Sequence, residues 1–266
     1  MGKSVTESAA HQAVMRDEAI EKYGLMFWGL SMRHYEDWAK CKNVWLARQS
    51  TFPVSYMTMP FLDALFALDM NAIDLTGKPA GFLYSIMYCL GMALRLEEGC
   101  VRDGHIYLSV EEETRTFKGI IVNVPNGEPV AITSSEFNQI RKIVAWMQGE
   151  EIPDETLNDD LLETEKLLAD KNSPHLKYSL LDLEAAVGLA YNTRIKEVLD
   201  WPILEFESAR RAIDRSKRFM ICGIGATNGC SWDGGNPYPS WCFDRERSGS
   251  NALIAASQFG QAKVKK

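Results

Sequence analysis

The side chains best suited to chemistry in this 266-residue sequence gather near its C-terminus. The segment Met220–Arg245 holds three of the six cysteines, with two tryptophans, five glycines and two prolines. Structural zinc is bound tetrahedrally, usually by closely spaced pairs of cysteine or histidine ligands. Here seven residues separate Cys222 from Cys230, and eleven separate Cys230 from Cys242. The spacing is therefore wider than that of a typical zinc-stapled module.

Three interpretations of these cysteines remain open. A zinc site would need a distant fourth ligand, such as Cys100 or His105. A disulfide between two of the three would form if the protein meets an oxidising exterior. Free thiols packed in a glycine-rich loop are the state that we expect, with no metal and no other cofactor.

The neighbouring residues indicate neither a nucleotide site nor a cysteine nucleophile. Cys222-Gly223-Ile224-Gly225 resembles half of a phosphate-binding loop, but it follows a predicted helix instead of a strand. A cysteine nucleophile needs a histidine base close to it. No histidine lies in a recognisable local signature; the four are His11, His34, His105 and His175. We therefore predict no catalytic residues and no enzymatic activity.

Arg194 and Lys196 suggest a DNA-binding alternative. Leu183–Leu199 can form two short helices around Ala190-Tyr191-Asn192, which resembles a helix-turn-helix with both cations on its second helix. The turn lacks a central glycine, and a net charge of −7 opposes attraction to phosphates. We favour an ordinary helix–loop–helix unit of the core.

An acidic block and a basic block of the sequence could orient a contact between two protein surfaces. Residues 150–165 contain eight acidic residues and no basic one. The basic block, opposed only by Asp214, consists of Arg210, Arg211, Arg215, Lys217 and Arg218. Both blocks can be solvated faces. They can also pair within the molecule or between neighbouring subunits, where opposite charges set orientation more than affinity.

The elements that must position these residues are mainly helices in the first hundred residues. After a polar arm, His11–Tyr23 and Phe27–Gln49 have helix-compatible apolar spacing. Pro60 favours the start of a further helix. Phe82–Leu96 is apolar on nearly every side, which is typical of a buried helix.

The pattern then changes to short strands. His105–Val110, Thr116–Val124 and Pro129–Ile132 are rich in β-branched residues. Asn126-Gly127 lies between the last two and is a strong hairpin signal. A small antiparallel sheet is predicted over residues 105–132.

Helices resume after this sheet. The Thr133-x-x-Glu136 spacing is that of a capping box. Ser179 can cap a helix through Tyr191, Thr193 can cap another, and the last predicted helix is Ile203–Phe219.

Beyond that helix, glycine and proline disfavour a regular helix, so Met220–Arg245 is expected to be an irregular strap. Its aromatic side chains need a buried surface, and we expect them to be interface anchors. They are Trp232, Tyr238, Trp241 and Phe243.

Together these patterns predict a mainly α protein with a small antiparallel β hairpin or sheet (α+β). We expect helical regions at 1–100 and 134–220, a sheet at 101–133, and the strap with a polar tail at 221–266. Apolar residues make up 46% and charged residues 24%, as in globular proteins. The longest uncharged run, Ala80–Leu94, is too short to span a bilayer, and no signal segment is recognisable at the N-terminus. We expect a soluble protein.

Two stretches carry a resemblance to a known group of proteins. The first is Trp38–Met70, reading WAKCKNVWLARQSTFPVSYMTMPFLDALFALDM. The second joins Ser134–Ile143 to the helix pair around Ala190-Tyr191-Asn192 that ends in Phe206. This order of elements, over about residues 35–220, resembles assembly and structural proteins of tailed bacteriophages.

The resemblance implies a non-enzymatic role through protein–protein contacts. Such proteins act as tail-assembly chaperones or as baseplate and hub components. Partners would be other phage structural proteins, in several copies, without nucleic acid or membrane, in the virion or in the host cytoplasm during assembly. The strap lies outside the resembling pattern, so its role is not implied by it.

Overall fold

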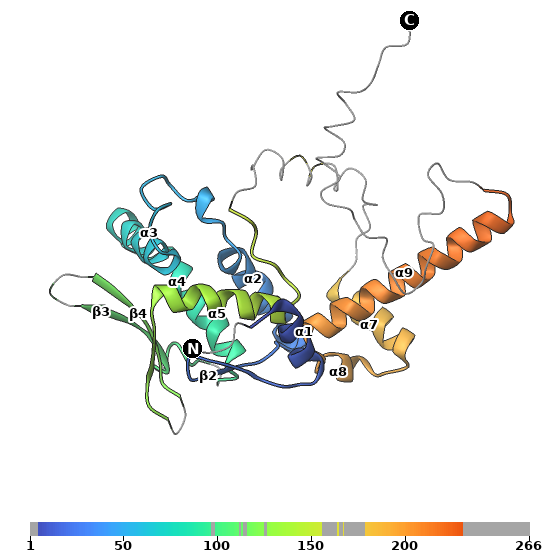
Figure 1. Cartoon of the computed structure of the whole chain (residues 1–266), viewed down its shortest axis with the longest axis horizontal. Helices are drawn as coiled ribbons and strands as arrows, with labels where there is room; N and C mark the ends of the chain where they lie inside the picture. Colours follow the sequence, from blue (N-terminus) through green and yellow to red (C-terminus); the bar gives the residue numbers. More distant parts are fainter. Residues whose placement is uncertain are drawn as a thin grey trace, which may run out of the picture. The chain divides into compact units, whose positions relative to one another are not determined.

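The computed structural model describes residues 5–96, 99–111, 113, 116–124, 127–155, 164, 167 and 179–230, and it has a mainly helical α+β fold (Figure 1). This confirms the predicted fold class. The first elements are α1 (Glu7–Met15), β1 (Ile20–Lys22), β2 (Leu25–Phe27), α2 (Tyr35–Trp45), α3 (Phe61–Thr76) and α4 (Phe82–Ala93). They are followed by β3 (Ile106–Glu111), β4 (Thr116–Val122), β5 (Val130–Ile132), α5 (Ser134–Met147), α7 (Leu180–Tyr191), α8 (Ile195–Val198) and α9 (Ile203–Thr227).

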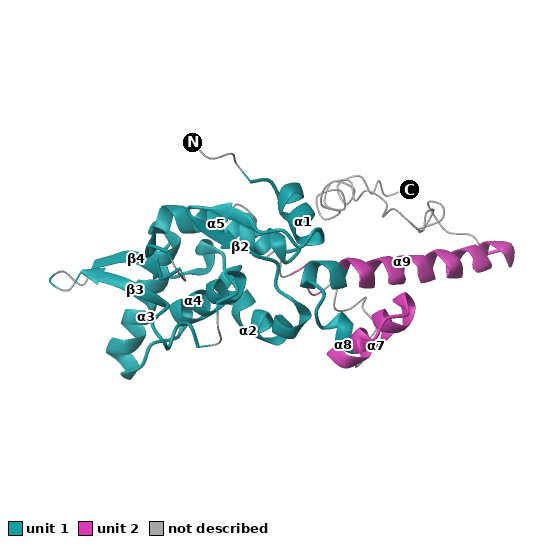
Figure 2. Cartoon of the chain, turned by 90° about the horizontal axis from the view of Figure 1, so that it is seen from below, with its two compact units in different colours: residues 1–155, 196–207 teal, residues 156–195, 208–266 magenta. Residues whose placement is uncertain are grey.

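The chain divides into two compact units (Figure 2). Unit 1 contains residues 1–155 and 196–207, and unit 2 contains residues 156–195 and 208–266. The chain therefore leaves unit 1 after α5 and returns to it for the residues that start α9. Among the described residues, no helix is both long enough and apolar enough to cross a membrane.

An aromatic cluster forms the centre of unit 1. The rings of Trp45 and Phe137 meet edge to face at 5.4 Å, and Phe61 stacks on Phe137 at 6.3 Å between centroids. Arg141 is buried beside them, and its guanidinium lies 3.7 Å from the centre of the Phe61 ring. The arginine donates hydrogen bonds to the carbonyl oxygens of Trp45, the last residue of α2, and of Ala47 just beyond it. α2, α3 and α5 therefore share one core.

Three predicted helix starts in this unit are confirmed. Pro60 immediately precedes α3, and α4 begins at the predicted Phe82. At the start of α5, the Thr133 hydroxyl accepts from the Glu136 amide while the Glu136 carboxylate accepts from the Thr133 amide. This reciprocal cap satisfies two amides that have no partner within the helix.

The buried helix α4 receives its cap from a residue far from its own start. The Asp69 carboxylate on α3 accepts from the amides of Gly81, Phe82 and Leu83 at 2.8, 3.2 and 2.9 Å. These are amides of the first turn, which lack partners within the helix. Asp69 is only 6% exposed, so it fixes α4 against α3 from within the core.

The predicted small sheet is present in the order β3-β4-β5, with antiparallel pairs. Gly119 is required in β4, because its φ is +144° and a Cβ there would lie 2.2 Å from the Ile132 carbonyl oxygen. The Phe66 ring of α3 stacks on the Phe117 ring of β4 at 5.1 Å between centroids, which holds the sheet against the helices. Asn126 of the expected Asn-Gly turn lies outside the described residues.

Two N-terminal predictions are wrong. The helix expected at His11–Tyr23 ends earlier, and β1 and β2 form a hairpin whose turn, Tyr23-Gly24, has φ of +54° and +77°. Positive φ at both positions is the geometry of a type I′ turn, which matches the twist of two paired strands. The helix expected from Phe27 begins only at Tyr35, because residues 28–33 form bonds to another part of the chain.

Candidate interaction surface on helix α9

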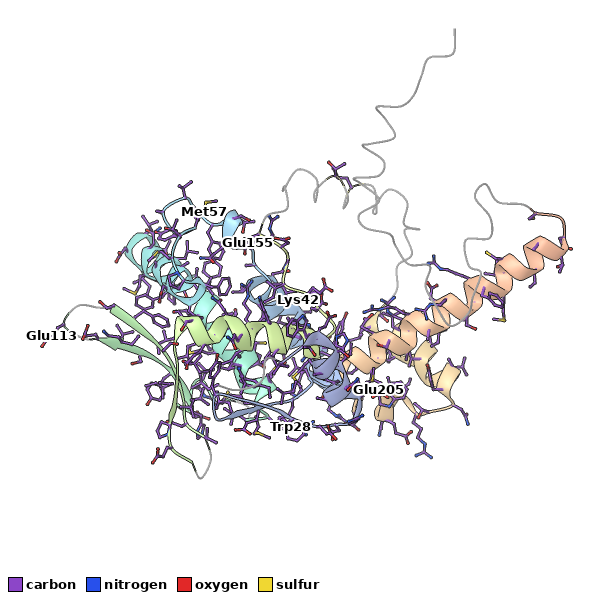
Figure 3. All side chains as sticks on the ribbon, in the orientation of Figure 1. Trp28, Lys42, Met57, Glu113, Glu155 and Glu205 are labelled. Atoms are coloured by element: carbon purple, nitrogen blue, oxygen red, sulfur yellow. The ribbon has the colours of Figure 1, made fainter. Side chains whose placement is uncertain are left out.

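α9 begins inside unit 1. The backbone of the 30–32 segment pairs with the residues before α9: Met32 donates to the Trp201 carbonyl and Ile203 donates to the Leu30 carbonyl, both at 2.8 Å. Phe206 is fully buried in the first turns. Glu205, labelled in Figure 3, places a carboxylate near the positive end of the helix dipole, and its partial burial raises its pKa. The start of the helix is therefore firmly held.

The helix extends well beyond its predicted end at Phe219. It continues to Thr227, so the expectation that the whole strap from Met220 is irregular is wrong for its first eight residues. Gly223 and Gly225 lie inside this extension. Each glycine costs about 1 kcal/mol relative to alanine in a helix. The twenty helical residues that precede Gly223, together with Ile224 between the two glycines, offset that cost.

α9 stops at a glycine-based turn. Gly229 has φ of +82°, the Cys230 amide donates to the Gly225 carbonyl at 2.9 Å, and the Gly229 amide donates to the Ala226 carbonyl at 3.1 Å. These two bonds define the Schellman motif, in which the left-handed glycine turns the chain away from the helix axis.

The predicted basic block lies on α9 in unit 2, but its residues do not share one face. Arg211, Arg215 and Arg218 follow an i, i+4, i+7 spacing, whereas Arg210 and Lys217 lie seven residues apart on a second stripe. Asp214 accepts from Arg218 at 2.9 Å, and both side chains are more than half exposed. A salt bridge so exposed contributes little to stability. The block thus presents two narrow basic stripes.

The second stripe leads directly into an apolar surface. Met220, Ile221 and Ile224 are 53%, 67% and 62% exposed. With Lys217 they follow the spacing i, i+3, i+4, i+7, so the four side chains project from one side of the helix. We call Met220, Ile221 and Ile224 the α9 apolar face. Sequence analysis missed it because these residues were assigned to an irregular strap, although the helical spacing was visible in the sequence.

Cys222 and Cys230 are not paired with each other. Cys222 is buried within α9, Cys230 is exposed just after the Schellman turn, and both are free thiols. No cluster of three metal-binding side chains exists within the ranges that the structure describes. Cys242 lies outside those ranges, so its possible disulfide and its place in a metal site stay predictions.

The predicted aromatic anchors also lie outside the described residues. They are Trp232, Tyr238, Trp241 and Phe243. The described part of the chain ends at Cys230, whose amide belongs to the Schellman turn.

The DNA-binding alternative depends on Arg194 and Lys196. α7 is capped as predicted, with Ser179 accepting from the Asp182 amide. α8, however, contains only the four residues Ile195–Val198. At 1.5 Å per residue it makes about one turn, whereas a recognition helix places several side chains along a DNA groove. The short length of α8 therefore gives no support to a DNA-binding helix-turn-helix.

A cavity of about 320 Å³ in unit 1 is lined in part by polar side chains. Its wall includes His34, Tyr88, Arg95 and Cys100. Burial raises the pKa of the Cys100 thiol, which disfavours a reactive thiolate. Arg95 is engaged by Asp17 at 2.8 Å and stacks over Trp28, labelled in Figure 3, at 4.0 Å.

The Tyr88 hydroxyl in this wall donates to Asp37 at 3.2 Å. A hydrogen bond from Lys40, with this smaller contribution from Tyr88, lowers the pKa of Asp37. Tyr88 and Arg95 are thus each engaged by a carboxylate outside the cavity wall, and no nucleophile–base pair is formed by the contacts described.

Comparison with protein-family models, with curated proteins and with solved structures finds no match for this chain.

Proposed function

We propose that this chain is a non-enzymatic structural or assembly protein of a bacteriophage tail or baseplate, acting through protein–protein contacts. The observation that carries the proposal is the α9 apolar face, where three large apolar side chains are each more than half exposed at the end of a 25-residue helix. The order of helices, hairpin and final helix pair that resembles phage assembly proteins supplies the biological setting.

The physical argument rests on the spacing and the surroundings of the face. Helical docking sites use anchors at i, i+3, i+4 and i+7, which is the spacing from Lys217 to Ile224. Covering the three apolar side chains would contribute about 3–5 kcal/mol at 25 cal/mol per Å². The adjoining basic stripes would favour a partner with acidic side chains and would fix its orientation.

The incorporation of a variant into particles tests this proposal. In the phage that encodes the chain, the triple substitution Met220→Gln, Ile221→Gln and Ile224→Gln should lower the amount of the protein in purified tails, or the yield of complete tails, at least tenfold. The isolated variant should keep its helix content and melting temperature, because the replaced side chains are exposed.

A matched control is Leu75→Gln on α3, which removes an apolar side chain that is 77% exposed on another element. This control should assemble normally. Normal assembly of the triple variant, or complete infectious particles made without the gene, would contradict the proposal. Binding of duplex DNA at low salt would favour the nucleic-acid alternative instead.

A further inference from the structure

β3 is an outermost strand of the three-stranded sheet, and among the described residues no strand lies beside its other side (Figure 1). In an antiparallel ladder, successive residues direct their backbone groups alternately to the two sides of the strand. The Asn123 amide donates to the His105 carbonyl at 2.8 Å, so His105 and every second residue after it face β4. The amides and carbonyls of Leu108 and Val110 therefore point to the open side.

The apolar side chains of β3 are buried less well than the residues with which they pair. Leu108 is half-buried opposite Ile120, which is fully buried. Val110 is 38% exposed opposite Phe117, which is 9% exposed. Phe117 stacks on α3, and paired residues lie on the same face of a sheet. The helix-facing apolar surface thus continues to the rim of the sheet, where a further strand would cover Leu108 and Val110.

β3 lacks the features that protect a sheet edge from pairing. Natural edges are commonly very short or carry proline or lysine. β5, the opposite edge, has three residues and directly follows Pro129. β3 has six residues with neither lysine nor proline, and its only acidic residue is the terminal Glu111. The bulge in this ladder adds Lys118 to β4 and leaves β3 regular. β3 is therefore the edge at which a partner strand can add.

The sequence of β3 is complementary to itself when two copies pair antiparallel about Ser109. Leu108 then lies opposite Val110 of the second copy, on the helix-facing side of both sheets. These two residues exchange backbone hydrogen bonds, and their apolar side chains meet in both halves of the symmetric contact. Tyr107 lies opposite Glu111 of the second copy, so the two Glu111 carboxylates stay apart.

The neighbouring symmetric register is less favourable. Pairing about Leu108 would place Ile106 opposite Val110 of the second copy and would call on the Ile106 amide as a donor. That amide already donates to the Cys100 carbonyl at 3.1 Å. Pairing about Ser109 uses only backbone groups of Leu108 and Val110, for which no bond to another part of the chain competes in the described structure.

We propose that two copies of this chain join through antiparallel pairing of β3, centred on Ser109, so that their three-stranded sheets form one six-stranded sheet. Stable interfaces bury at least about 1,200 Å² in total, and one pair of short edge strands buries less. The dimer is therefore weak and its population depends on concentration. This contact uses a surface other than the α9 apolar face and does not depend on the proposed phage function.

A disulfide cross-link tests the register. Cys230 is exposed, so Cys230 and Cys242 are first replaced with serine. Opposite residues that exchange no hydrogen bonds have Cα atoms about 4.5 Å apart, which a disulfide can span. The two copies of position 107 would be about 13 Å apart along the strands, which is too far. Under mild oxidation, Ser109→Cys should therefore give at least tenfold more disulfide-linked dimer than the control Tyr107→Cys.

Sedimentation over a range of concentrations tests the edge itself. Val110→Pro removes an amide that faces the open side, so it costs no bond to β4 and should raise the dissociation constant of the dimer at least tenfold. The matched control is Ala131→Pro on β5. Ile121 faces β3, so its β5 partner Ala131 also directs its amide away from β4. This control should leave the dissociation constant unchanged.

Circular dichroism reports whether each variant stays folded, and Val110→Lys, which places a cation at the edge, provides a second reading if the proline variant unfolds. A chain that stays monomeric at every concentration would overturn the inference. Equal cross-linking from positions 107 and 109, or a dimer that neither substitution of Val110 weakens, would overturn it as well. Protection of the β3 amides from hydrogen exchange only after a different protein is added would assign the edge to that protein instead.

Discussion

Arg141 is the buried charge on which the core of unit 1 depends. Desolvation lowers its pKa from the ordinary value to about 10, so the buried guanidinium is less stable in its charged form than it would be in water. That cost is offset by hydrogen bonds to the Trp45 and Ala47 carbonyls and by the Phe61 ring. The Trp45 indole in turn donates to the Arg141 carbonyl at 3.1 Å. One residue thus joins the end of α2 to α5.

Replacing Arg141 with alanine should therefore lower the free energy of unfolding by about 2–4 kcal/mol, because two carbonyls lose their donor inside the core. Urea unfolding followed by circular dichroism measures this loss. Arg211→Ala, which removes an exposed guanidinium from α9, is the control and should change stability by less than about 0.5 kcal/mol. A loss no larger for Arg141 than for Arg211 would show that the buried hydrogen bonds are not stabilising.

At the scale of single elements, Asp69 determines where α4 begins. Asp69→Ala removes the acceptor for three amides of the first turn and should destabilise the protein by about 1–3 kcal/mol. Asp69→Asn keeps one carbonyl acceptor and should destabilise the protein less than Asp69→Ala does. Asp74→Ala, at an exposed position of the same helix α3, is the control. Hydrogen exchange at Gly81 to Leu83 measures the local change, and unaltered exchange in Asp69→Ala would contradict this role.

The elements that the sequence predicted well are those with a local boundary signal. Pro60, Thr133 and Ser179 each mark a helix start through chemistry contained within a few residues. The β1–β2 hairpin was missed because its turn places Tyr23 in a left-handed conformation, which tyrosine rarely adopts. The cap supplied by Asp69 could not be predicted, because the acceptor and the amides lie on different elements.

α9 shows how a correct local rule can give the wrong boundary. Glycine disfavours a helix. Extending a helix that is already formed is nevertheless favourable enough to offset the free-energy cost of two isolated glycines. α9 instead ends at Thr227, and Gly229 just beyond it supplies the left-handed φ that the Schellman turn requires. The apolar face follows from this longer helix, so ending the predicted helix at Phe219 hid the main candidate site although its spacing is present in the sequence.

At the scale of the whole molecule, contacts between distant parts of the sequence hold unit 1 together. The buried Gln148 side chain accepts from the Leu30 amide, 118 residues away, at 3.1 Å. The Glu155 carboxylate, labelled in Figure 3, accepts from the amides of Gln49 and Ser50 at 2.9 and 3.0 Å. Hydrogen bonds between residues so far apart in the chain leave no periodic pattern in the sequence. Individual helices could therefore be predicted, whereas the packing of one helix on another could not.

We propose that the α9 apolar face contacts another structural protein when the chain is assembled. A photo-reactive amino acid placed at Ile221, which is 67% exposed, tests it in assembling phage particles, with the same probe at Leu75 as the control. We expect cross-links from position 221 to a different phage structural protein, and none to that protein from position 75. Cross-links from position 221 that reach only the same chain, or equal cross-linking from both positions, would contradict the claim.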